Sequence, residues 1–113
     1  QQCWMAVPIG KLKNQNYRAT DRDPAKKTCR LTASRSSLIT PTSPLEVDQG
    51  EPVHQVLNLA EWRERAVSLH LYSRPFSTCE VYSLEKGTYC DVPLYYTSEY
   101  GKLSAGEAAT LSR

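Results

Sequence analysis

The sequence predicts a mainly β protein, a compact disulfide-stapled β-sandwich with one short helix. Three observations predict it: segments that alternate apolar and polar residues, turn residues between them, and four widely spaced cysteines in 113 residues. A domain of this length buries only about two-thirds of the surface that its unfolded chain exposes, so crosslinks would supplement a small core. We therefore expect a single secreted domain over residues 1–113.

The N-terminal part predicts three short strands. Cys3–Ile9 is rich in apolar residues, and residues 28–34 alternate apolar with polar side chains, which is typical of a half-buried strand. Between them, Asn14–Asn16 and Asp21–Pro24 supply turn chemistry around a possible strand over Tyr17–Thr20.

A long exposed loop is expected over residues 36–53. This stretch contains three prolines and a cluster of Ser and Thr, which interrupt the strand pattern before and after it. Such a loop is either an ordinary surface connection or a contact surface.

The one helix is predicted near residues 58–66. Asn58 can cap its first turn, and Glu61, three residues later, can reach back to the cap nitrogen. About two turns are expected, with Trp62 anchoring the helix in the core.

The C-terminal half predicts a strand and then a hairpin. In the strand over residues 67–72 the apolar side chains are expected inward (Val67, Leu69, Leu71) and the others outward (Ser68, His70, Tyr72). The hairpin pairs residues 78–84 with 88–93, and Gly87 suits the positive φ of a bulged loop.

The cysteines point to disulfides in a secreted protein. They are separated by 25, 49 and 10 residues, whereas zinc sites present close pairs, so no metal is expected. If Tyr82 faces Cys90 in the hairpin, Cys79 and Cys90 point to opposite sides, so all three pairings stay open. The local pairing, Cys3 with Cys29 and Cys79 with Cys90, is slightly favoured.

No apolar run is long enough to span a membrane, and the start of the chain reads as a processed, secreted form.

The basic residues near the N-terminus and the tyrosines near the C-terminus suggest two contact surfaces. Residues 1–35 carry eight Lys or Arg against two Asp, a basic patch that could meet an anionic surface or an acidic partner, or be a solvated face. Tyrosine offers a large, rigid contact area with a polar tip. The predicted partner-binding residues are Lys11, Lys13, Arg18, Lys26, Lys27, Tyr95, Tyr96 and Tyr100.

A catalytic function is less favoured by the sequence than a function in partner binding. The sequence contains no Gly-rich phosphate loop, nucleophile elbow or metalloprotease motif, and we expect no catalytic residue and no cofactor. His54 and His70 could serve a small secreted ribonuclease as acid and base, or be ordinary loop and strand residues. Trp4, Trp62 and the tyrosines leave glycan or cell-wall binding as a further alternative.

Two cysteine-bearing segments support a family resemblance. The run Val67-Ser-Leu-His-Leu-Tyr-Ser-Arg-Pro-Phe-Ser-Thr-Cys79, followed by Gly87-Thr-Tyr-Cys90, resembles small secreted fungal proteins with a βγ-crystallin-like or related Greek-key β-sandwich over residues 66–104. The resemblance implies a non-catalytic, effector or toxin-like virulence protein that binds a host or target-cell protein.

Overall fold

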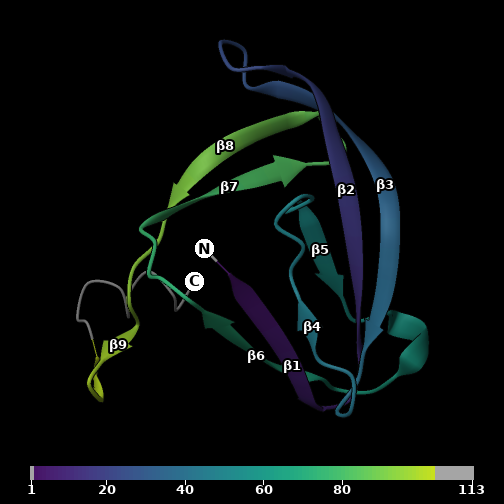
Figure 1. Ribbon diagram of the computed structural model, residues 1–113, viewed down its shortest axis with the longest axis vertical. Coiled ribbons are helices and arrows are strands. Elements are labelled where there is room, and N and C mark those ends of the chain that lie inside the picture. The colour runs from purple at the N-terminus through teal and green to yellow at the C-terminus, as the bar shows by residue number, and fades with distance from the viewer. Residues whose placement is uncertain (1, 104–113) are drawn as a thin grey trace.

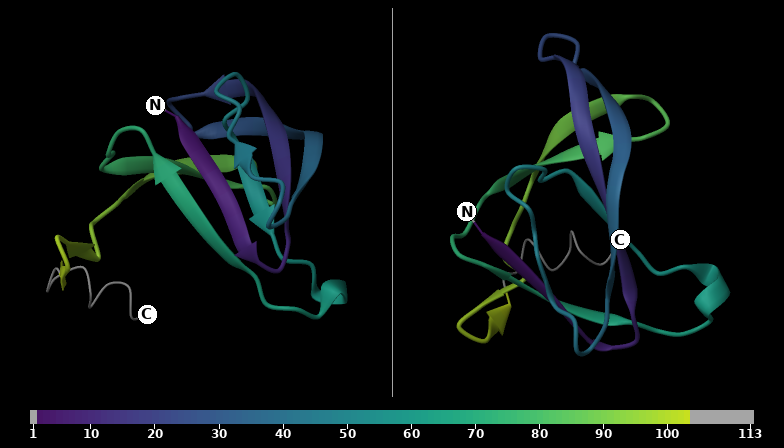
Figure 2. Two further views of the ribbon diagram at one scale, coloured as in Figure 1. Left: turned by 60° about the horizontal axis from the view of Figure 1, so that its bottom comes forward. Right: turned by 45° about the vertical axis from the view of Figure 1, so that its right-hand side comes forward.

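The computed structural model describes residues 2–103 and confirms a mainly β protein with few helical residues. All pairings between strands are antiparallel, and the strands of two sheets curve around a common interior (Figures 1 and 2). Within the described residues, no helix is long and apolar enough to cross a membrane.

Three sheets account for the strands of residues 2–103. The first has the order β4-β1-β6 and consists of β1 (Cys3–Ile9), β4 (Leu45–Glu46) and β6 (Val67–Tyr72). The second has the order β5-β2-β3-β8-β7 and consists of β2 (Leu12–Asp23), β3 (Thr28–Ile39), β5 (His54–Leu57), β7 (Thr78–Ser83) and β8 (Thr88–Pro93). A small third sheet pairs β9 (Ser98–Glu99) with β10 (Lys102–Leu103).

The longest strands, β2 and β3, form one hairpin. Its turn lies at residues 24–27, where the Asp23 carboxylate accepts hydrogen bonds from the amides of Ala25 and Lys26. The turn expected at Asn14–Asn16 is wrong, because β2 runs through it and both asparagines are buried. The loop expected over residues 36–53 is also shorter, since β3 ends at Ile39 and β4 interrupts the remainder.

The core joins the two larger sheets. Met5 and Val7 on β1 pack with Leu12 at the start of β2 and Ile39 at the end of β3. Three of these four side chains are only 1% exposed, so this contact removes apolar surface from water and holds the sheets together.

Strand β6 has the predicted bounds, but its two faces are the reverse of those predicted. Partners across an antiparallel pair share a face, and His70 is paired with Met5, which is buried, while Leu71 is paired with Trp4. His70 therefore shares the inward face with Ser68 and Tyr72, whereas Leu69 and Leu71 are 62% and 66% exposed.

The predicted disulfides are absent: all four cysteines are free thiols. In the β7–β8 hairpin, Cys79 is paired with Val92 and Cys90 with Val81. The two cysteines therefore share a face as diagonal neighbours, about 7–8 Å apart, beyond the usual reach of a disulfide. The expected register, with Tyr82 opposite Cys90, is wrong by one residue.

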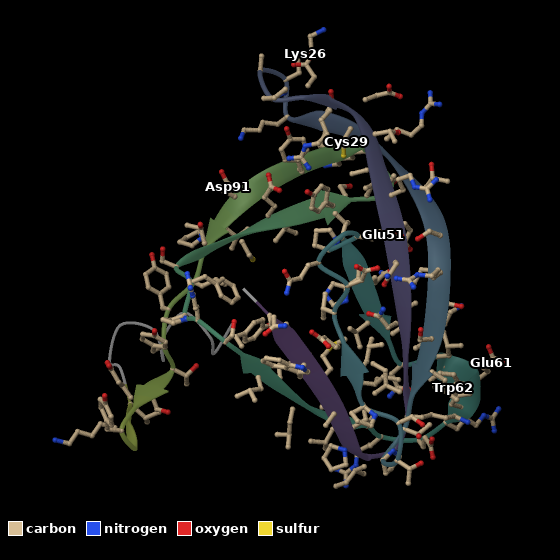
Figure 3. The ribbon with its side chains drawn as sticks, in the orientation of Figure 1. Lys26, Cys29, Glu51, Glu61, Trp62 and Asp91 are labelled. Carbon is tan, nitrogen blue, oxygen red and sulfur yellow. The ribbon has the colours of Figure 1, made fainter. Side chains whose placement is uncertain are left out.

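The helix is a single 3-10 turn over Ala60–Trp62. Asn58 does not cap it and instead donates a hydrogen bond from its side-chain amide to the Glu64 carbonyl. Trp62 lies at the edge of the fold, with the Lys11 ammonium 4.8 Å from its ring centroid (Figure 3). A two-turn helix anchored in the core does not form.

Candidate functional site

The inward faces of both larger sheets border an open pocket of about 660 Å³. Residues from β2, β3, β5 and β7 meet there with the end of β6 and the segment that follows it. The lining residues are Tyr17, Leu31, Pro52, Val53, His54, Gln55, Tyr72, Phe76, Cys79, Glu80, Val81, Tyr82, Leu84 and Leu94.

His54 is the imidazole of this pocket, and burial keeps it neutral. It begins β5, where it is paired with Asn16 of β2. Burial lowers the pKa of His54, and the nearby charge of His70 lowers it further. A neutral imidazole retains one ring nitrogen with a free lone pair, which can accept a proton or bind a metal.

Two buried asparagines of β2 support His54. Asn14 and Asn16 are two residues apart and therefore point to the same side of the strand, toward the interior. The Asn14 amide nitrogen Nδ2 donates to Oδ1 of Asn16 at 2.6 Å, and Oδ1 of Asn14 lies 2.7 Å from Nδ1 of His54. Buried amides require such partners, because an unpaired one would cost on the order of 1–3 kcal/mol.

Tyr72 and Cys79 also line the pocket, and Cys3 lies beside Tyr72. Tyr72 on β6 is paired with Cys3 on β1. Burial raises the pKa of Tyr72, and the nearby thiols of Cys3 and Cys79 raise it further. The ring of Phe76 contacts Tyr72 edge-on, with centroids 4.9 Å apart. On the same face of β6, the Ser68 hydroxyl lies 2.9 Å from Nε2 of His70.

The rim near β7 is held by Arg22. Its guanidinium donates to the Tyr82 hydroxyl at 2.8 Å and to the Glu80 carboxylate at 3.0 Å, and it lies 4.4 Å from the centroid of the Tyr89 ring. The hydrogen bond from Tyr82 lowers the pKa of Glu80, and Arg22 lowers it further. This network joins β2 to the β7–β8 hairpin.

The predicted basic contact residues are spread over the length of β2. Lys11 precedes the strand, Lys13 is paired with Leu57 of β5, and Arg18 is exposed. Lys26 lies at the tip of the hairpin (Figure 3), and Lys27 forms a 3.9 Å ion pair with Asp91. Because β2 is 12 residues long, the two ends of this set lie far apart, at the start of the strand and at the tip of its hairpin. Their role in binding a partner stays a prediction.

The predicted tyrosines lie away from His54. Tyr95 and Tyr96 border a second hollow of about 470 Å³ with Pro75, Phe76, Ser77 and Leu94, and Tyr100 is exposed between β9 and β10. Their role as a contact surface also stays a prediction.

Sequence reasoning missed the residues that the pocket brings together. His54 was expected in a loop, Asn14 and Asn16 in a turn, and Tyr72 on the outer face of its strand. The available signal was the period of two itself: Leu12, Asn14 and Asn16 alternate with Lys13 and Gln15 along one strand. A polar residue on the inward face of a strand is a candidate site residue.

Convergent polar groups with shifted pKa values, in a pocket between sheets, mark this region of the β protein as a candidate small-molecule site. Comparisons with known proteins show which protein family the chain belongs to. The family model described as cysteine dioxygenase type I matches residues 1–85, so the chain belongs to this family. All the lining residues except Leu94 fall in the matched range.

Curated relatives agree with the family. The chain is 28% identical over 100 residues to cysteine dioxygenase type 1 of Danio rerio, covering 88% of this chain and 48% of that protein. It is 27% identical over 99 residues to the Homo sapiens and Bos taurus proteins of that name, covering 88% of this chain and 47% of each. The chain thus spans about half the length of these relatives.

The family match overturns three expectations and leaves two alternatives without support. The resemblance to βγ-crystallin-like proteins is wrong, as is the effector or virulence role, because the match is to a dioxygenase family. The non-catalytic reading is wrong for the same reason, and neither the ribonuclease nor the glycan-binding alternative is supported.

The described residues do not by themselves fit a metal centre of the kind that non-haem oxygenases use, which takes two histidines and a carboxylate. Across residues 2–103 no three His, Cys, Asp or Glu side chains are grouped to hold a metal ion. Oε1 of Glu51 is buried without a hydrogen-bond partner, yet Glu51 does not line the pocket. His54 offers one donor nitrogen, and one nitrogen is not a metal site.

Proposed function

We propose that the protein takes part in the dioxygenation of a small thiol, with cysteine as the first candidate. The observation that carries the proposal is the family match, whose residues 1–85 include nearly the whole pocket. The relatives are cysteine dioxygenases by name. A thiol RSH and one O2 give a sulfinic acid RSO2H: the S–H bond is lost, two S–O bonds form, and both oxygen atoms end on sulfur.

The pocket chemistry supports a small polar substrate. Apolar side chains, among them Leu31, Phe76 and Leu94, cover part of the wall, while His54 and Tyr72 present polar atoms that can orient a ligand. The neutral imidazole of His54 can accept the proton that a bound thiol releases, because a thiolate is the reactive form of the group.

The test uses the 113-residue chain with added ferrous iron, cysteine and labelled 18O2. We expect cysteine sulfinate that carries two labelled atoms, with one O2 consumed per product. Serine, which has the same shape without sulfur, should give no O2 uptake.

Two variants separate the pocket from the rest of the surface. His54→Ala should reduce the rate at least about 10²-fold, the contribution typical of a positioned acid or base. Arg18→Ala, on the exposed part of β2, should leave the rate unchanged. Absence of labelled sulfinate from the folded wild-type protein would contradict the proposal for this chain.

A further inference from the structure

The arrangement of Asn14 and His54 determines more than the position of an imidazole. A neutral histidine has one protonated and one unprotonated ring nitrogen, and the partner of one nitrogen decides the state of the other. Nδ1 of His54 lies 2.7 Å from Oδ1 of Asn14, an oxygen that can only accept a hydrogen bond. The proton must therefore be on Nδ1.

Asn16 fixes which atom Asn14 turns toward the histidine. The amide of Asn14 has a donor end and an acceptor end, and a flip would exchange them. Its donor end is used, because Nδ2 donates to Oδ1 of Asn16 at 2.6 Å. Both amides are at most 7% exposed, so water does not compete readily for either end.

We propose that Asn14 is a positioning residue that holds His54 with its proton on Nδ1 and its lone pair on Nε2. Nε2 lies on the ring edge turned away from Asn14, in a side chain that lines the pocket. The chain of contacts runs from Asn16 through Asn14 to His54 and ends at a nitrogen ready to accept a proton or bind a ligand. The use of that nitrogen rests on the proposed function, whereas the tautomer does not.

The test is the nitrogen NMR spectrum of His54 in the 15N-labelled protein without added metal, recorded well above pH 6.5. His70 supplies an internal comparison, since its Nε2 faces the Ser68 hydroxyl instead of an amide. We expect a protonated Nδ1 and an unprotonated Nε2 for His54. A proton on Nε2 in the wild-type protein would overturn the proposal.

Two variants of nearly equal size separate positioning from packing. Asn14→Asp keeps an oxygen acceptor toward His54 and should keep the Nδ1–H signal, whereas Asn14→Leu removes the acceptor and should lose it. Retention of the Nδ1–H tautomer in Asn14→Leu would contradict the role of Asn14. If Asn14→Leu does not fold, the wild-type spectrum and Asn14→Asp still decide.

Activity gives a separate readout. If the protein oxidises cysteine, Asn14→Leu should lower the rate about 10- to 100-fold, as loss of a residue behind a working histidine typically does. Asn14→Asp should recover most of that loss. If the tautomer is as expected but no thiol is oxidised, the proposed function fails while the positioning of His54 stands.

Discussion

His70 lies opposite Met5 across β1 and β6, so it shares a face with one of the most deeply buried side chains of the protein. This pairing assigns both faces of β6. The alternate residues Leu69 and Leu71 point outward and are largely exposed, although they are the apolar residues of the strand.

Shortening a side chain on the inward face should therefore cost much more stability than shortening one on the outward face. Met5→Ala should lower the free energy of unfolding by about 2–5 kcal/mol, because it leaves a cavity in the core. Leu69→Ala should cost less than about 0.5 kcal/mol, as is usual for an exposed position. Urea unfolding followed by circular dichroism measures both values, and an equal cost would contradict the assigned faces.

Gly10 is predicted to be irreplaceable for two reasons. Its φ of +76° disfavours residues with a Cβ, and a Cβ at this position would collide with the Arg65 carbonyl oxygen and lie 2.9 Å from Cα of Ala66. Gly10→Ala should thus cost roughly 2–5 kcal/mol, the sum of backbone and steric terms.

Gly101 is the matched control for Gly10. Its φ is +80°, yet a Cβ there would meet nothing within 4 Å. Gly101→Ala should cost about 1–2 kcal/mol, the backbone term alone. Thermal unfolding of the two variants gives the difference, and equal Tm values would show that the collision is relieved without cost.

Glu80 should make stability depend on pH in the acid range. Its pKa is lowered in the folded protein by the Tyr82 hydroxyl and Arg22, so the unfolded chain binds the proton more readily. The stabilisation is present in full above the ordinary value of 4.5 and is lost as the pH falls through the lower folded value. Since the side chain is 39% exposed, solvent screening keeps the effect below about 1 kcal/mol.

The comparison with Glu80→Gln isolates this carboxylate. Wild type should be the more stable protein at pH 6, and the difference should shrink below pH 4. Denaturant unfolding at several pH values measures it. A constant difference from pH 6 to pH 3 would exclude the titration of Glu80 as the cause.

The four thiols should react with a thiol reagent in an order set by burial. Cys90 is exposed and should react first, whereas Cys29 is buried and should react only on unfolding. Ellman's reagent, followed in the native protein and then in denaturant, measures this order. Fewer than four thiols in the denatured, unreduced protein would contradict the free cysteines.

Local patterns predicted much of the secondary structure. The bounds of β1 and β6 match the predicted ranges, and Gly87, with a φ of +65°, lies in the predicted hairpin loop. These features depend on neighbours in the sequence, through the period of two and the φ of glycine. The sandwich arrangement stays a prediction.

The site depended on contacts that are distant in the sequence. Asn14 and Asn16 have the composition of a turn, but His54, about 40 residues away, satisfies Asn14 inside a strand. The outward prediction for His70 and Tyr72 failed because both side chains have partners on the inner side of β6: Tyr72 lines the open pocket, and Nε2 of His70 contacts the Ser68 hydroxyl. The disulfide prediction was wrong because an even number of cysteines shows only that pairing is possible. Whether Cys79 and Cys90 can bond depends on the register of β7 and β8.

The outward leucines of β6 have a practical consequence for handling the isolated chain. Among residues 2–103, β6 is the last strand of its sheet, and no described strand pairs with its outer edge beside Leu69 and Leu71. Edges of this kind initiate intermolecular sheets when no charge or proline protects them. Solubility, more than folding stability, will therefore set the concentration at which samples can be prepared.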